Sequence, residues 1–223
     1  MSESDSTVPT GDSGDLPESL RLSAVEARIL GCLIEKEATT PEQYPLTENA
    51  IVVASNQKTN RDPLMELSPG DVGHALRQME PRRLVRSVHG ARAQRYEHHL
   101  DKVYSITAQQ QALLAVLMLR GPQTLAELQT RSERMAKFNG TDDVRHALER
   151  LADRSPALVI RMHKAPGQRE ERYAHLLCGP VDPGSAPAER APRSAGNEAL
   201  EHRIDALEAR IEVLERALAA LGG

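Results

Sequence analysis

The sequence predicts a mostly helical α+β protein with two tandem winged helix-turn-helix modules and a C-terminal coiled-coil helix. Three observations support this prediction. A block of about 75 residues occurs twice in the middle of the chain, with its elements in the same order. Aromatic residues make up only 2% of the 223 residues, so the cores must be aliphatic, which suits helices packed on small sheets. A heptad spacing of Leu and Ile runs through residues 197–223.

The repeat is carried by two pairs of matching motifs. Val72-x-His74-Ala75-Leu76 returns later in the chain as Val144-x-His146-Ala147-Leu148. Arg95-Tyr96-Glu97-His98 returns as Arg172-Tyr173-Ala174-His175. Because an apolar helical segment precedes each copy and the order of elements is kept, we predict two copies of one module.

Each module is predicted to contain three helices. A capping box marks the start of the first helix, at Ser23 with Glu26 in the first module and at Thr107 with Gln110 in the second. The second helices are predicted over Leu46–Asn56 and Thr124–Met135. The third helices are predicted to be capped at Ser68-Pro69 and Thr141-Asp142 and to run to about Arg82 and Asp153.

A β-hairpin is predicted to close each module. In the first it joins Leu84–Val88 to Gln94–His98 across a loop with Gly90, and in the second it joins Leu158–Met162 to Glu171–Leu176 across Pro166-Gly167. Three helices followed by a two-stranded hairpin are typical of a winged helix-turn-helix. We therefore predict module boundaries at residues 20–102 and 103–178.

The ends of the chain differ from the modules in composition. Residues 1–19 form an acidic leader that is predicted to be disordered, and residues 179–196 form a Pro/Gly/Ala-rich linker. The heptad seam of residues 197–223 predicts self-association, although an amphipathic helix that packs back on its own domain is the alternative. The seam consists of Leu200, Ile204, Leu207, Ile211, Leu214, Leu218 and Leu221.

Several strings resemble a known family. They are Leu-x-x-x-Glu-x-Arg-Ile-Leu-Gly-x-Leu-Ile-Glu-Lys at residues 22–36, Thr-Thr-Pro-Glu-x-Tyr-Pro-Leu at 39–46, Asn-Gln-Lys-Thr-Asn-Arg at 56–61, Arg-Gly-Pro-Gln-Thr at 120–124 and Glu-Arg-Met at 133–135. Over roughly residues 20–180 the chain resembles the YceH-like proteins, an uncharacterised bacterial group. The resemblance implies a tandem winged-helix fold, and it implies no established activity, catalytic residues or cofactor.

The charge layout favours double-stranded DNA as a partner. The net charge of −4 is divided unevenly, and both predicted hairpins are basic: residues 81–96 hold five arginines and no acid. A helix in the major groove and a basic wing on the phosphates would use these residues. The candidate DNA-contacting residues are His74, Arg77, Gln78, Arg82, Arg83, Arg86, Arg92, Arg95, Arg145, Arg161, Lys164 and Arg169.

A protein-interaction scaffold, with the winged helices as docking platforms, is the alternative function. The net charge of residues 21–177 is only slightly positive, so the arginines could also form an ordinary solvated surface. A polar run between the second and third helices is a capped turn or a contact loop for a phosphate or a partner. Its candidate contact residues are Asn56, Gln57, Lys58, Asn60 and Arg61.

Other chemistry finds little support in the sequence. Cys32 and Cys178 are predicted to be buried apolar residues, and the histidines at 89, 98 and 99 lack further ligands at metal-binding spacing. We find no phosphate-binding glycine loop, nucleophile elbow or carboxylate pair, so we expect no enzyme activity, cofactor or metal. Residues 1–20 do not resemble a signal peptide and no long apolar run is present, so a cytoplasmic location without a membrane partner is expected.

Overall fold

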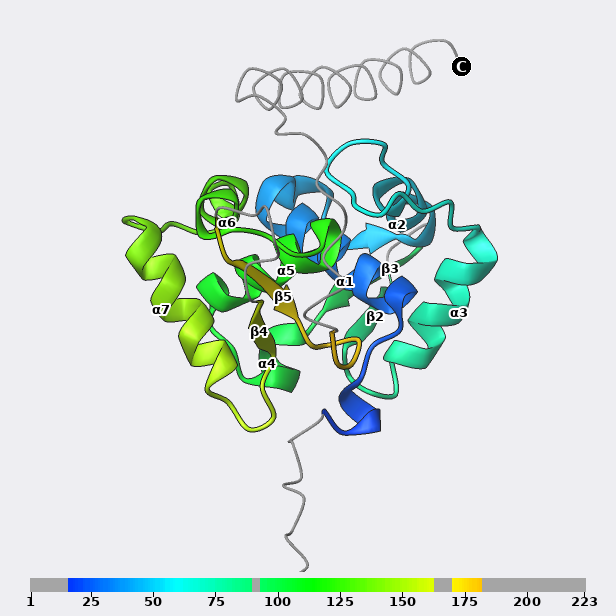
Figure 1. Cartoon of the computed structure of the whole chain (residues 1–223). Coiled ribbons are helices and arrows are strands. Elements are labelled where there is room, and N and C mark those ends of the chain that lie inside the picture. The colour runs from blue at the N-terminus through cyan, green and yellow to red at the C-terminus, as the bar shows by residue number, and fades with distance from the viewer. Residues whose placement is uncertain (1–15, 90–92, 163–169, 182–223) are drawn as a thin grey trace, which may run out of the picture.

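The computed structural model describes residues 16–89, 93–162 and 170–181, and within them the chain is mostly helical α+β (Figure 1). Seven α-helices and two small antiparallel sheets make up this part of the chain. The elements are η1 (Glu18–Leu20), α1 (Ala24–Thr39), η2 (Pro41–Gln43), β1 (Leu46–Thr47), α2 (Glu48–Ser55), α3 (Pro69–Met79), β2 (Val85–His89), β3 (Gln94–His98), α4 (Leu100–Tyr104), α5 (Ala108–Arg120), α6 (Leu125–Ser132), α7 (Thr141–Ala152), β4 (Val159–Met162) and β5 (Arg172–His175). Residues 1–15 of the acidic leader and the heptad seam lie outside the described residues, whereas Leu16 is buried and η1 begins at Glu18.

Both halves of the chain follow the predicted order of elements. In the first unit the sheet order is β1-β3-β2, with Leu46 opposite Tyr96 and Val85 opposite His98. In the second unit β4 pairs with β5, and Gln123 forms an isolated bridge with Tyr173. Because Tyr173 matches Tyr96 in the repeat, this bridge is the second unit's counterpart of the pairing between β1 and β3.

The predicted capping boxes of the first helices are confirmed. Ser23 and Glu26 cap α1, and Thr107 and Gln110 cap α5, each with the side chain and backbone bonds in both directions. Ser68 caps α3 in the same way, with Asp71 as its partner. The repeat motif is also explained, because its Val, Ala and Leu residues are buried on α3 and α7 while His74 and His146 are exposed.

Three local predictions were wrong, and one short helix was not predicted. Leu46 and Thr47 belong to β1 and not to the second helix, because Leu46 pairs with Tyr96 and Thr47 caps α2. The N-cap of α7 is Gly140 and has no side-chain cap, while Thr141 is already helical. The short helix α4 was not predicted, and it contains the predicted boundary between residues 102 and 103. Cys32 is buried as predicted, but Cys178 is exposed.

The two units share one hydrophobic core. Helices α1 and α5 lie at the centre of the molecule, whereas α3 and α7 lie on opposite flanks (Figure 1). A Cβ atom on Gly31 of α1 would lie 2.9 Å from Cγ of Leu119 on α5, so the missing side chain permits this close approach. The backbone N–H of Leu22 also donates to the carbonyl of Leu177, at 2.7 Å. The packing therefore joins the repeats into one body.

Candidate interaction surfaces

Helix α3 presents one polar side to solvent. Its buried side chains include Val72, Leu76 and Met79, which anchor the helix on the core. His74, Arg77 and Gln78 are exposed on the opposite side, as an amphipathic helix requires. These three candidate DNA-contacting side chains are therefore accessible.

Arg82 has a structural contact instead of a free guanidinium. It forms an ion pair with Glu26 at 2.8 Å and donates to the carbonyls of Ser19 and Arg21, at 3.0 and 2.5 Å. The second unit repeats this arrangement, since Arg154 donates to the carbonyls of Tyr104 and Ser105. Both arginines follow the third helix of their unit and hold the backbone just before its first helix, so the repeat itself carried the signal for this role.

The other predicted arginines of the first unit differ in how far they are engaged. Arg83 is exposed at the turn after α3, where its φ is 58°. Arg86 is 64% exposed but pairs with Glu97 at 2.6 Å. Arg95 is exposed and donates to the carbonyl of Pro45 at 2.7 Å. Arg92 lies outside the described residues.

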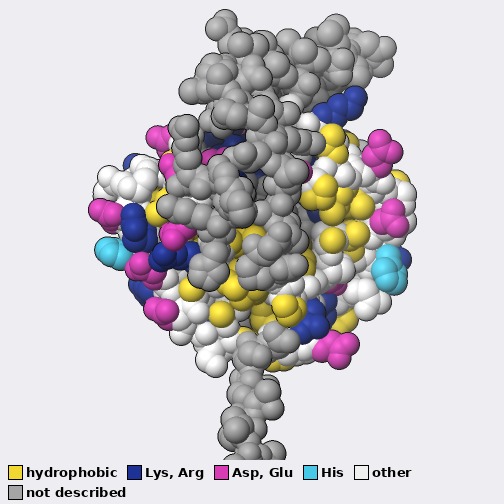
Figure 2. All heavy atoms as spheres, viewed as in Figure 1, with side chains coloured by type: hydrophobic (Ala, Val, Ile, Leu, Met, Phe, Trp, Pro, Cys, Tyr) yellow, Lys and Arg dark blue, Asp and Glu magenta, His cyan; other side chains and the backbone are white. Residues whose placement is uncertain are grey.

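The second unit offers a more balanced charge. Arg161 pairs with Glu171 at 2.7 Å, and Arg145 lies 3.8 Å from Asp142. Lys164 and Arg169 lie outside the described residues. The exposed side of α7 carries two acids and two arginines, at positions 142, 145, 149 and 150. In the view of Figure 2, acidic and basic side chains are likewise interspersed over this flank.

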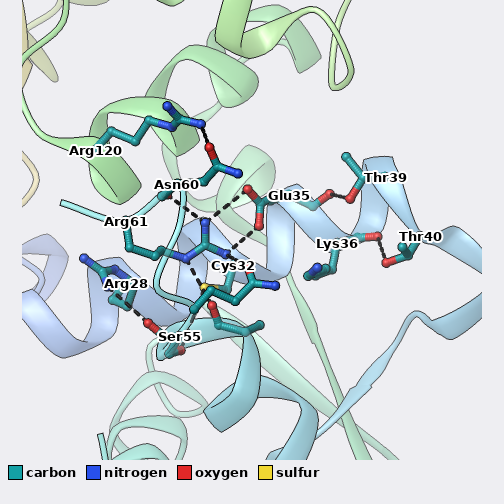
Figure 3. Close-up of polar contacts among 12 residues, drawn as sticks. Arg28, Cys32, Glu35, Lys36, Thr39, Thr40, Ser55, Asn60, Arg61 and Arg120 are labelled. Carbon is teal, nitrogen blue, oxygen red and sulfur yellow. Dashed lines mark hydrogen bonds and ion pairs between the residues drawn. The ribbon is translucent and has the colours of Figure 1, made fainter. Parts of the chain in front are cut away.

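The polar run of residues 56–61 is folded around a buried ion pair (Figure 3). Arg61 reaches Glu35 of α1 at 2.6 Å and donates to the carbonyl of Ala54 at 3.0 Å, and its side chain is fully buried. Burial alone would raise the pKa of the Glu35 carboxyl, but the charge and hydrogen bonds of Arg61 outweigh burial and hold that pKa below its ordinary value. Arg61 therefore cannot serve as the partner contact that its position in a polar run suggested.

The remaining residues of the run also face the protein in part. Asn56 exchanges hydrogen bonds with the backbone of Leu67, at 2.9 and 2.8 Å. Gln57 accepts from Arg61 at 2.7 Å, and Asn60 accepts from Arg120 of α5. Among the five predicted contact residues, only Lys58 is classed as exposed. The sequence did not predict the contact between Arg61 and Glu35, because the two residues are far apart along the chain.

A second buried arginine holds the same connection. Arg28 is 1% exposed and donates to the carbonyls of Ser55 and Pro63, at 3.1 and 2.6 Å. Cys32 lies beside this network, and burial raises the pKa of its thiol, which disfavours the reactive thiolate. Burial has the opposite effect on a cation, and it lowers the pKa of Arg28. Sequence reasoning missed Arg28 because its neighbours on α1 are apolar.

A polar cavity of about 410 Å³ lies where α1, β3, α4 and α5 meet. Its buried polar residue is His98, which pairs with Glu37 at 2.8 Å and accepts from the backbone N–H of Leu100 at 3.4 Å. Both ring nitrogens are therefore engaged. In the described part of the chain, no three His, Cys, Asp or Glu side chains are grouped to hold a metal ion, and no helix is long and apolar enough to span a membrane.

The described part of the chain is thus a mostly helical α+β fold with one order of elements present twice. It exposes the polar sides of α3 and α7, residues of the β2–β3 hairpin and part of the connection between α2 and α3. The chain belongs to the family described as "Protein of unknown function, DUF480", whose model matches residues 22–168. It is 51% identical over 216 residues to a UPF0502 protein of Stenotrophomonas maltophilia (strain R551-3), covering 95% of this chain and 99% of the relative. A UPF0502 protein of Mesorhizobium japonicum is 49% identical over 211 residues, covering 95% and 100% of the two chains.

Proposed function

We propose that the chain is a tandem winged-helix protein of the YceH-like type and that its first unit binds double-stranded DNA. The order of elements supports the fold assignment, because each unit has three helices in sequence, a short strand or bridge before the second helix, and a closing hairpin. In this fold the third helix is the element that enters the major groove.

The exposed polar side of α3 is the observation that carries the proposal. Arg77 and Gln78 lie near the C-terminal end of the helix, with hydrogen-bonding groups suited to guanine and adenine edges. Arg83 and Arg86 follow on the turn and the hairpin, where they can approach phosphates. The first unit is the better candidate, because the exposed Arg83 follows its third helix, whereas Ser155 holds the matching position in the second unit.

Few phosphate contacts are expected. Arg82 is held by Glu26, and Arg86 must share its charge with Glu97. A small number of contacts predicts weak non-specific binding with a shallow salt dependence, since the salt slope scales with the phosphates neutralised. Any strong affinity would then have to come from base contacts at a particular sequence.

Fluorescence anisotropy of the full chain with random-sequence duplex DNA at about 50 and 200 mM salt tests the proposal. We expect weak binding that declines modestly between the two salt concentrations and is lost in an Arg77→Ala/Arg83→Ala/Arg86→Ala variant. The matched control is Arg145→Ala/Arg150→Ala on α7, which should bind like the wild type. Arg82→Ala should lower stability without a specific effect on binding. Equal binding by the two multiple variants, or no binding at 50 mM salt, contradicts the proposal.

A protein-interaction scaffold remains the second candidate, and one observation favours it. Val53 and Leu64 are large apolar side chains that are 48% and 62% exposed. Self-association through the heptad seam also stays a prediction from the sequence, since residues 197–223 lie outside the described part of the chain. Light scattering of the full chain, compared with Leu207→Lys/Leu214→Lys, tests the seam, and a monomer in both cases would reject it.

A further inference from the structure

The connection between α2 and α3 presents an apolar tip on the surface. Leu64 is 62% exposed and follows the exposed Pro63, and Val53 on the neighbouring helix α2 is 48% exposed. Figure 2 shows apolar side chains gathered on the side of the molecule where α2 and α3 lie. We call Val53, Asp62, Pro63, Leu64 and Glu66 the Leu64 corner.

Hydrogen bonds of Arg28, Asn56 and Asp62 hold this corner in place. The guanidinium of Arg28 bonds both the Ser55 and Pro63 carbonyls, so the end of α2 and the start of the tip are held side by side. The Asn56 side chain bonds Leu67 on the other side of the tip. The N–H of Asp62 donates to the carbonyl of Leu119 at 2.8 Å, which attaches the connection to α5. The exposed tip is therefore preorganised.

Holding the corner in this way requires two arginine side chains to be buried. Burial of a guanidinium opposes folding, and Arg28 and Arg61 are both below 6% exposed. The second unit makes the corresponding connection between α6 and α7 with the shorter segment 133–140. The same order of elements thus forms without this braced connection.

The charges around the tip select its partner. Asp62 and Glu66 are exposed on either side of Leu64. These carboxylates repel phosphates, which disfavours nucleic acid at this corner. Lys58 is the exposed cation of the same connection. The corner thus combines an apolar anchor with net negative charge, which complements apolar side chains flanked by lysine or arginine.

We propose that the Leu64 corner is a docking site for a basic amphipathic segment of a partner protein. Leu64 and Val53 contact the apolar side of that segment, while Asp62 and Glu66 pair with its basic flanks. The preorganised loop lowers the ordering entropy lost on binding. This site is independent of the proposed DNA contacts of Arg77 and Gln78.

The test uses the full chain and two synthetic 18-residue helical peptides with the same Leu spacing, one with lysine and one with glutamate on the flanks. Fluorescence anisotropy should detect binding of the lysine peptide only. We expect Leu64→Ser, and separately Asp62→Asn/Glu66→Gln, to weaken it by about tenfold. Gln78→Ser on the exposed side of α3 is the matched control and should have no effect.

Three outcomes overturn the proposal. The lysine peptide fails to bind the wild type, or it binds the wild type and Leu64→Ser equally, which indicates attraction to the acidic chain as a whole. The third is a dimer in light scattering that Leu64→Ser converts to a monomer, because a second copy would then occupy the corner. DNA affinity of Leu64→Ser should stay at the wild-type value, so this test and the test of DNA binding fail separately.

Discussion

The two units build the same order of elements on different interiors. When Ile29 of α1 is aligned with Leu113 of α5, Arg28 and Glu35 of the first unit correspond to Ala112 and Leu119 of the second. The first unit uses its buried charges to hold a long connection to α3, whereas the second unit has an apolar helix at the same positions. The buried charge is therefore an addition to the fold and not a requirement of it.

The largest effect is expected when the first unit loses the Glu35 carboxylate, which pairs with the buried Arg61. Glu35→Ala leaves the fully buried Arg61 without its carboxylate, and we expect the free energy of unfolding to fall by about 3–5 kcal/mol. Urea unfolding at neutral pH followed by circular dichroism measures this.

The matched control is Glu171→Ala in the second unit, which breaks the solvent-exposed pair with Arg161 and should leave the urea midpoint nearly unchanged. A Glu35→Ala variant as stable as Glu171→Ala would remove the distinction between the units. Glu35 has a lowered pKa, so its contribution is present at pH values above its ordinary 4.5 and is lost as the pH falls through the lower folded value. The difference between Glu35→Ala and wild type should therefore shrink in acid.

Local chemistry made much of the fold predictable. Capping boxes at Ser23 and Thr107 and the cap at Ser68, together with apolar periodicity, located the helices, and β3 spans the predicted Gln94–His98. The two-residue strand β1 has too few residues to show a pattern, because it exists through its pairing with Tyr96. The helix α4 is short and depends on its place between the units.

The candidate site was less predictable, because charge in a sequence does not show its partner. Arg82 and Arg86 were grouped as one basic wing, but Glu26 and Glu97 neutralise them through tertiary contacts. Arg61 was grouped with solvent-facing polar residues and is buried against Glu35. The repeat gave one indication of a structural role. Arg154 holds the position of Arg82 in the second unit, and an arginine present in both units can serve the fold and need not contact DNA.

A smaller effect is expected at the junction of the two units. The position of α5 that matches Gly31 is Ala115, so Gly31→Ala makes the two helices alike there. The new methyl group would meet Leu119 at 2.9 Å, and overpacking should lower the free energy of unfolding by about 1–3 kcal/mol. Thermal unfolding measures this as a lower Tm.

Gly73→Ala on α3 is the control for the glycine substitution itself. Its Cβ would meet only the ends of the Glu48 and Arg77 side chains, at 3.2–3.3 Å, so it should be neutral or stabilising through helix propensity. If Gly31→Ala were as stable as Gly73→Ala, the close packing of α1 on α5 would not hold. If the clash is the cause, Gly31→Ala should cost less stability in a Leu119→Ala background than in the wild type.

The smallest effect is confined to acid and separates two histidines that the repeat makes equivalent. His98 of the first unit pairs with Glu37, whereas the Nδ1 atom of His175 is buried without a hydrogen-bond partner among the described residues. Burial lowers the pKa of His175 to about 4. Between this value and the ordinary 6.5 the unfolded chain binds the proton first, so stability falls as the pH drops through that window.

Replacing the ring in His175→Leu should therefore reduce the loss of stability between pH 7 and pH 4.5, measured as urea midpoints at both values. His146→Leu on the exposed side of α7 should lose as much stability as the wild type over the same range. Equal losses in all three proteins would mean that His175 gains a proton in the folded chain as readily as in the unfolded one, and the contrast between the two histidines would then disappear.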